Sequence, residues 1–390
     1  MEQRRFPGNS HWYHETQSTL TPHAAPLFPE AAEIEDRFLL GLAQQYQNEL
    51  QQTLLQTQPA MLASRDLYQL LLPRQLTTSK THTLTLYDRL STALTVAQVT
   101  GIQRLCNHYA ARLNPLPGPD STRESNRRLT QITEYARQLA SQPTLIDEAA
   151  LSRLDDVGLT APDIMTFHQL IGFVSYQARI VAGMNALLAL PVRWIPGGTL
   201  PEDAGRDGFT PASPWRPLLP PVELRYASES QIAALACCQP LPLPDHSAWL
   251  LAHDGQTLYG WANLLNALKE STDSPEARLA AAVAARINGS PVCFANAAEG
   301  EMREALLEGI DEALSLATPE QKAIIHCAAQ LTRSPERFSA AHLQPLKEAG
   351  FSDKMVFTLL QSTALASWNN RLMHALGSTQ PQVQERAEPL

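Results

Sequence analysis

The chain carries the same segment twice, at a constant offset of 192 residues. The segment that begins at Gly158 recurs at Gly350, and the register then holds without a gap. A fixed offset over about fifty residues is the signature of a duplicated domain, and two copies are too few for a solenoid. The matched pairs are Ala136/Ala328, Gln138/Gln330, Leu139/Leu331, Pro143/Pro335, Gly158/Gly350, Thr166/Thr358, Gln169/Gln361, Ser175/Ser367, Tyr176/Trp368 (aromatic for aromatic) and Arg179/Arg371.

Each copy of the repeated segment predicts a turn followed by a long helix. In the first copy Thr160 can cap the helix, Pro162 suits its first turn, and Asp163 can reach back to the cap. The second copy begins at Ser352 and ends at a glycine stop, Gly377.

Almost no segment of the chain alternates with a period of two, so the predicted fold class is all-α. Apolar residues recur with helical spacing in most of the remaining sequence. The expected helices begin at residue 31 (Phe38, Leu39, Leu42 and Tyr46 on one face) and cover 66–72, 84–113, 120–141, 148–157, 162–190, 229–238, 248–268, 274–288, 291–313, 319–331, 341–348 and 354–377.

The length of 390 residues allows two domains with ordinary cores. Proline and glycine punctuate residues 196–222, which we interpret as the connector, and its Phe209 and Trp215 indicate that it packs against a domain. The expected organisation is a polar tail (1–30), a first domain (31–195), the connector (196–222), a second domain (223–379) and a C-terminal tail (380–390).

Composition excludes several classes of partner. A net charge of −9 argues against nucleic acid and against an anionic membrane surface. The first twenty residues lack the apolar run of a signal peptide, and the apolar stretch 164–178 contains His168 and Gln169, as a buried core helix would. Five cysteines, an odd number, predict free thiols in a reducing compartment, so a cytoplasmic location is expected. No sequence pattern indicates a cofactor, and His11 and His14 in the tail are too few for a metal site.

One cysteine occupies a position that can activate a thiol. Asn288 and Gly289 predict a left-handed end to an alanine-rich helix, after which Ser290 can cap a new helix. Cys293 then lies at the third helical position, where the free N–H groups and the helix dipole favour a thiolate. We therefore expect the pKa of Cys293 to fall.

This arrangement resembles the active-site helix of the carboxymuconolactone decarboxylase and AhpD-like alkylhydroperoxidase family. The likeness covers residues 84–190 and 274–377, and includes Gly350-Phe351-Ser352 and the Asn370-Arg371 pair near a helix end. It implies two tandem AhpD-like domains that imitate a homodimer within one chain and that assemble into a homo-oligomer. The chain as a whole resembles the tandem-domain bacterial members that are described as peroxidase-related oxidoreductases with an antioxidant role.

The family's catalytic set is incomplete in this chain. Against the family pattern Cys-x-x-Cys-x-x-x-His, Ser290 replaces the first cysteine, Cys293 is the second, and Ala297 replaces the histidine. Arg278 stands where the family has a glutamate, with Glu276 nearby. In the first copy, a one-residue insertion is needed to bring Cys106 onto Cys293.

The favoured hypothesis is a thiol-dependent oxidoreductase that acts on a peroxide or a small disulfide, with a thiol protein as its reductant. Cys293 is the candidate nucleophile, and Ser290 and Glu276 complete the candidate site. Two alternatives are open: a catalytically degenerate binding or scaffold protein, and a cysteine-independent decarboxylase or isomerase.

Other reactive side chains have ordinary structural interpretations. A thiol and an imidazole two residues apart, such as Cys106 and His108, do not share a helix face, and adjacent residues such as His326 and Cys327 diverge in the same way. The adjacent Cys237 and Cys238 rarely reach relaxed disulfide geometry. For the repeated Arg179 and Arg371 we favour a structural role, in which each satisfies carbonyl groups at a helix end, over substrate binding.

Overall fold

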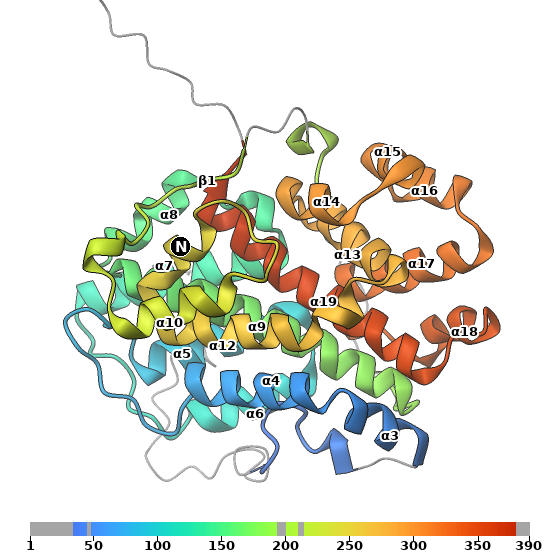
Figure 1. Ribbon diagram of the computed structural model, residues 1–390. Helices are drawn as coiled ribbons and strands as arrows, with labels where there is room; N and C mark the ends of the chain where they lie inside the picture. Colours follow the sequence, from blue (N-terminus) through green and yellow to red (C-terminus); the bar gives the residue numbers. More distant parts are fainter. Residues whose placement is uncertain (1–33, 45–47, 193–199, 210–213, 380–390) are drawn as a thin grey trace, which may run out of the picture.

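The computed structural model describes residues 34–44, 48–192, 200–209 and 214–379, and this part of the chain is almost entirely helical (Figure 1). The all-α prediction is confirmed: the strands within the described residues are a two-residue antiparallel pair, β1 (Arg216–Pro217) and β2 (Gly377–Ser378). Both predicted tails, with His11 and His14, and part of the connector lie outside the described residues.

The first half contains seven α-helices and two 3₁₀ turns within the described residues. In chain order they are η1 (Leu42–Gln44), α3 (Asn48–Gln56), α4 (Gln58–Leu71), α5 (Leu86–Thr100), α6 (Gln103–Leu113), α7 (Arg123–Ser141), η2 (Pro143–Leu145), α8 (Glu148–Asp155) and α9 (Ala161–Leu187).

The connector opens the second part of the chain. Its described elements, besides the two strands, are η3 (Arg206–Phe209), η4 (Leu224–Tyr226), α10 (Glu229–Cys238), α11 (Ser247–Leu251), η5 (Ala252–Asp254), α12 (Gly255–Thr272), α13 (Pro275–Asn288), α14 (Pro291–Ala297), α15 (Gly300–Glu308), α16 (Ile310–Leu316), α17 (Pro319–Arg333), η6 (Pro335–Arg337), α18 (Ala340–Glu348) and α19 (Asp353–Leu376).

The structure corrects several predicted helix boundaries. The helix expected from residue 31 is replaced by turns and η1, because Leu40 and Gly41 adopt positive φ angles of 52° and 75°. The helix expected over 291–313 is three short ones, and Gly309 with φ 165° and ψ 170° separates the last two. The helix expected over 248–268 is interrupted by η5.

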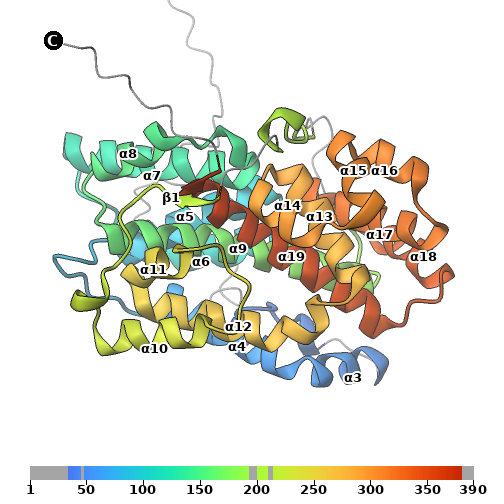
Figure 2. The same ribbon diagram turned by 45° about the horizontal axis from the view of Figure 1, so that its top comes forward.

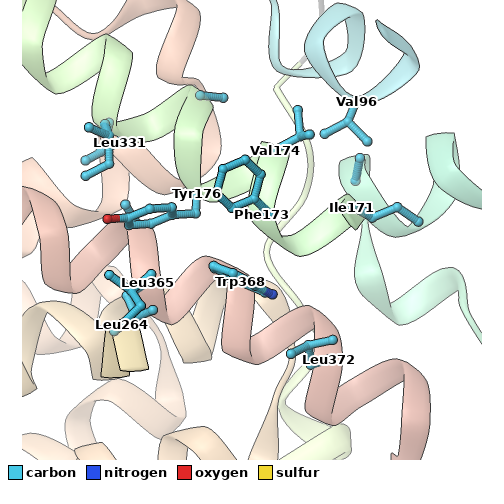
Figure 3. Packing of buried hydrophobic residues seen from close by; sticks show 14 of the residues in the cluster. Val96, Ile171, Phe173, Val174, Tyr176, Leu264, Leu331, Leu365, Trp368 and Leu372 are labelled. Atoms are coloured by element: carbon cyan, nitrogen blue, oxygen red, sulfur yellow. The ribbon is translucent and has the colours of Figure 1, made fainter. Parts of the chain in front are cut away.

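The two copies of the repeated helix, α9 and α19, pack against each other in the middle of the molecule (Figures 1 and 2). The ring centres of Phe173 and Tyr176 on α9 lie 5.7 and 5.8 Å from the ring centre of Trp368 on α19 (Figure 3). The Trp368 indole N–H donates a 3.0 Å hydrogen bond to Oε1 of Gln169. Gly172 makes room for this ring, because a Cβ there would stand 1.9 Å from Cδ1 of Trp368.

The start of α9 follows its predicted cap. The Thr160 hydroxyl accepts a hydrogen bond from the Asp163 N–H, and the Asp163 carboxylate accepts one from the Thr160 N–H. The same carboxylate also accepts hydrogen bonds from the N–H groups of Thr83 and Leu84, which fastens the loop that precedes α5 to the start of α9. Asp163 thus serves both the cap and the tertiary contact.

Two buried arginines link the copies reciprocally. Arg179 of α9 donates from Nη2 to the carbonyl oxygen of Thr332, near the end of α17, at 2.7 Å. Arg371 of α19 donates from Nη2 to the carbonyl oxygen of Ala140, near the end of α7, also at 2.7 Å. Ala140 and Thr332 are themselves 192 residues apart. The predicted structural role of the arginines is confirmed, with the addition that each satisfies a helix end in the opposite copy.

Buried apolar side chains from both halves belong to one connected cluster. Helix α4 of the first half packs along α12 of the second, and Figure 2 shows both on the same side of the molecule as α3 and α10. The domain boundaries expected at residues 195 and 223 stay a prediction.

The connector packs onto the second half, as its aromatic residues predicted. Trp215 is buried and donates from Nε1 to the carbonyl oxygen of Met373 at 2.8 Å. The ring centres of Phe209 and Phe294 lie 5.3 Å apart. The Arg286 guanidinium lies 5.1 Å from the centre of the Phe209 ring. Gly377 ends α19 in an extended conformation, and a Cβ there would clash with the Trp215 ring.

Candidate functional site

The predicted thiol site lies at the junction of α13 and α14. Gly289 has a φ of 75° and ends α13 in the left-handed conformation, as its sequence predicted. A Cβ at this position would stand 2.4 Å from Cγ2 of Thr144 and 2.8 Å from Cβ of Ala204, so the junction is also tightly packed. Helix α14 begins at Pro291, and Cys293 is its third residue.

The pKa of Cys293 does not shift in the direction expected at this helix start. Cys293 is partly exposed as a residue, yet burial of its thiol raises the pKa to about 11, and the neighbouring Ser290 side chain opposes that rise. Ser290 takes the N-cap position but makes no side-chain hydrogen bond to the helix, which has only seven residues. The prediction of a lowered pKa is therefore wrong, because desolvation of the buried thiol favours its neutral form.

Glu276, the remaining candidate of the thiol site, lies in the first turn of α13. It lies twelve positions before Asn288, which is about 18 Å along the helix axis. Arg278, which stands at the family's glutamate position, instead pairs with Glu299 and reaches the carbonyl oxygen of Asn296 at 3.4 Å. Ser290 is thus the candidate that lies beside the Cys293 thiol, whereas Glu276 is at the far end of α13.

The first copy has a matching junction without a thiol. Gly101 ends α5 with a φ of 68°, and α6 begins two residues later, just as α14 begins two residues after Gly289. Leu105 follows Gly101 by four residues, as Cys293 follows Gly289, so Leu105 is the structural counterpart of Cys293. Cys106 lies one position further along α6, and the two junctions match without an insertion. His108 is buried and lies 2.6 Å from the Tyr68 hydroxyl, in a structural hydrogen bond.

The other thiols match their structural interpretation. All five cysteines are free. Burial raises the pKa of both Cys238 and Cys327 to about 12. The thiol of Cys237 lies 3.2 Å from Oδ1 of Asn263, and His326 is exposed while Cys327 is buried, so the two diverge as predicted.

A cavity of about 60 Å³ lies between the two copies. Several residues of the first copy that line the cavity have their counterparts, 192 positions later, in the lining as well. Such pairs in the lining are Arg179 and Arg371, Ala140 and Thr332, and Pro143 and Pro335.

The two arginines are the buried charges of this cavity, at 2% and 1% exposure. Burial lowers the pKa of Arg179 to about 10, and Glu336 opposes this shift. Burial lowers the pKa of Arg371 well below its usual value, and repulsion from Arg179 adds to the effect. Among the described residues neither guanidinium forms an ion pair, although Glu336 also lines the cavity, and the two like charges repel each other.

Four buried polar atoms on residues that line the cavity lack a hydrogen-bond partner within the described residues. They are Nε of Arg179, Nε of Arg371, Nδ2 of Asn288 and Oγ1 of Thr332. The three nitrogens can only donate, and the hydroxyl can donate. The sequence assigned the arginines a structural role and Asn288 a place at a helix end, and it gave no role to Thr332. The recurrence of an arginine at the 192-residue offset is the signal that pointed to this region.

A larger cavity, about 410 Å³, lies within the first half beside the start of α5. Its charged lining residues include Asp88 and Arg128, which stand 3.7 Å apart as an ion pair. Arg128 also donates to the Thr83 hydroxyl and to the carbonyl oxygen of Val157. These polar groups are already satisfied, so they do not call for a ligand.

Comparisons with protein-family models, curated proteins and solved structures found no match for this chain. Within the described residues, none of the helices has the length and apolar character that crossing a membrane requires. The same residues contain no cluster of three histidine, cysteine, aspartate or glutamate side chains arranged to hold a metal.

Proposed function

We propose that this chain acts by binding a ligand between its two copies, and not by thiol chemistry. The observation that carries the proposal is the cavity between the copies, in which Arg179 and Arg371 are buried without an ion pair among the described residues. Each guanidinium donates to two backbone carbonyl oxygens, which offsets part of the cost of burying its charge. The cost that remains is the repulsion between two like charges that have no carboxylate of the described residues bonded to them. Unpaired charges that persist in a cavity favour a binding role.

The proposal includes the origin of the fold. We take the two halves to be copies of one AhpD-like module, fused so that the chain imitates a homodimer. The reciprocal contacts of Arg179 with Thr332 and of Arg371 with Ala140 support this, because a two-fold related pair of subunits would exchange the same contacts. Further assembly of the chain into a homo-oligomer stays a prediction.

The competing proposal is the thiol-dependent oxidoreductase with Cys293 as its nucleophile. It is supported by the place of Cys293 in the first turn of α14, beside Ser290. A pKa of about 11 counts against it, because only about one thiol in ten thousand would be ionised at pH 7. The thiolate is the reactive form, so reaction with a peroxide would be slow.

Peroxide consumption in the presence of thiol reductants separates the two proposals. We expect the wild type, Cys293→Ser and the matched buried-cysteine control Cys327→Ser to consume peroxide at the same low rate. If the wild type and Cys327→Ser were active and Cys293→Ser were not, the binding proposal would be wrong.

The pH dependence of alkylation tests the same point without a substrate. Mass spectrometry of the Cys293 peptide after pulses of iodoacetamide gives the midpoint of its reaction. We expect a midpoint more than one pH unit above that of a free thiol, about 8.5, because burial raises the pKa of Cys293. A midpoint at or below the free value would favour the oxidoreductase.

A further inference from the structure

We propose that the cavity between Arg179 and Arg371 binds a small oxyanion, either an inorganic oxyanion such as phosphate or a short carboxylate. The inference rests on the proposed binding function and names the chemical class of its ligand.

The first argument is the kind of hydrogen-bonding group left over in the cavity. Three of the four unpartnered atoms are N–H donors, on Arg179, Arg371 and Asn288, and the fourth is the Thr332 hydroxyl. These four side chains are between 1% and 5% exposed. A buried donor without a partner costs about 1–3 kcal/mol. A ligand with several acceptor oxygens and no competing donors would satisfy the whole set.

The second argument is charge. The other two nitrogens of each guanidinium donate to backbone carbonyl oxygens, so neither guanidinium forms an ion pair among the described residues. Glu336 lies near Arg179, but its counterpart 192 residues earlier is Thr144, so Arg371 lacks the equivalent carboxylate. An anion beside Arg371 would complete the charge balance.

Two carboxylates, those of Glu202 and Glu336, are also among the residues that line the cavity. Glu202 of the connector is exposed and Glu336 is partly exposed, whereas the arginines are buried. Burial raises the pKa of Glu336, and the Arg337 side chain stands 3.4 Å from its carboxylate. Among the residues that line the cavity, the two carboxylates are therefore more exposed than the two guanidiniums.

The third argument is size. A cavity of about 60 Å³ has room for roughly four water molecules, since each needs about 10–15 Å³ by this measure. That space suits phosphate or a carboxylate of a few heavy atoms, and it excludes a nucleotide or a peptide.

Anion-dependent stability of the full chain tests the proposal. Thermal unfolding is measured with sodium phosphate, sodium acetate, and sodium chloride at equal ionic strength. At about 10 mM ligand and a Kd of about 1 mM, the oxyanion should raise Tm by about 2 °C over chloride. The phosphate and acetate arms tell the two sources of the oxyanion apart. Equal Tm values in all three salts, or a greater effect of chloride, would overturn the proposal.

Three variants locate the site by titration calorimetry. Thr332→Val and Asn288→Ala each remove one donor and should weaken oxyanion binding about fivefold. Arg371→Gln should weaken it at least about tenfold. Ser91→Ala is the matched control, because Ser91 also carries a buried unpartnered hydroxyl but does not line the cavity.

If Arg371→Gln fails to fold, the two small substitutions Thr332→Val and Ser91→Ala still test the site. Should Thr332→Val and Ser91→Ala bind the oxyanion equally well, the cavity holds only water or nothing, and the inference is wrong. This outcome is independent of peroxide consumption by Cys293→Ser, so failure of the anion site and failure of the proposed function can be told apart.

Discussion

The substitution Gly172→Ala probes the contact between α9 and α19 most directly. The added Cβ would stand 1.9 Å from Cδ1 and 2.3 Å from Nε1 of Trp368, whereas ordinary contact begins at 3.4 Å. The fully buried indole must therefore move by about 1.5 Å (3.4 − 1.9 Å). Overpacking of this kind costs about 1–3 kcal/mol.

Two further contributions adjust the magnitude. The movement breaks the 3.0 Å hydrogen bond from Trp368 to Gln169, which costs about 1 kcal/mol. Alanine gains about 1 kcal/mol over glycine in a helix interior. The expected net loss is about 2 kcal/mol in the free energy of unfolding, measured by urea denaturation.

Gly183→Ala supplies the matched control in the same helix. The atom it would crowd most, at 2.9 Å, is Cδ1 of Leu360, the end of a flexible side chain that can rotate away. The helix gain should offset that adjustment, so the unfolding free energy should change by less than about 0.5 kcal/mol. Equal losses for Gly172→Ala and Gly183→Ala would refute the argument.

A double variant checks that Trp368 is the group displaced. Trp368→Leu alone leaves a void in the core and destabilises the protein. In the double variant, the methyl group of Gly172→Ala fills part of that void. The double variant should therefore lose less unfolding free energy than the sum of the two single variants, by at least about 1 kcal/mol. Strict additivity would mean that the added methyl is accommodated elsewhere.

Two further predictions concern buried titratable groups. His168 lies 2.6 Å from the Tyr135 hydroxyl and 2.7 Å from the Ile164 carbonyl oxygen, and burial lowers its pKa to about 4. Since the unfolded chain takes up the proton below about pH 6.5, this group should reduce the unfolding free energy by about 3 kcal/mol between pH 6.5 and 4. Urea titrations across this range should show a flatter pH dependence for His168→Gln, and an unchanged slope would contradict the assignment. Arg179 and Arg371 repel each other, so each single change to Met also relieves repulsion. The double variant should therefore lose about 1 kcal/mol more than the sum of the singles, and a smaller loss would exclude repulsion between them.

Local rules accounted for most of the helix ends. The cap at Thr160 and Asp163 and the left-handed stop at Gly289 were predictable because they involve residues a few positions apart. The rules failed at η1, where Leu40 adopts a positive φ that apolar periodicity could not reveal.

The thiol site shows where local reasoning stops. Cys293 occupies the predicted helical position, but the sign of its pKa shift is opposite to the one expected. The helix dipole is a property of adjacent residues, whereas desolvation depends on which distant segments cover the thiol. The cavity is a similar case: the repeat identified Arg179 and Arg371, but nothing in the spacing indicated that both would line one cavity.

The sequence by itself determined the helical class, the 192-residue repeat and the position of most helix ends, because these follow from hydrogen bonds and side-chain spacing within a few turns. Only the tertiary structure decided that Arg179 and Arg371 each reach a helix end in the opposite copy, and that the thiol of Cys293 is desolvated. Burial and the pairing of charges arise when segments far apart in the chain pack together, and no local pattern encodes which segments meet.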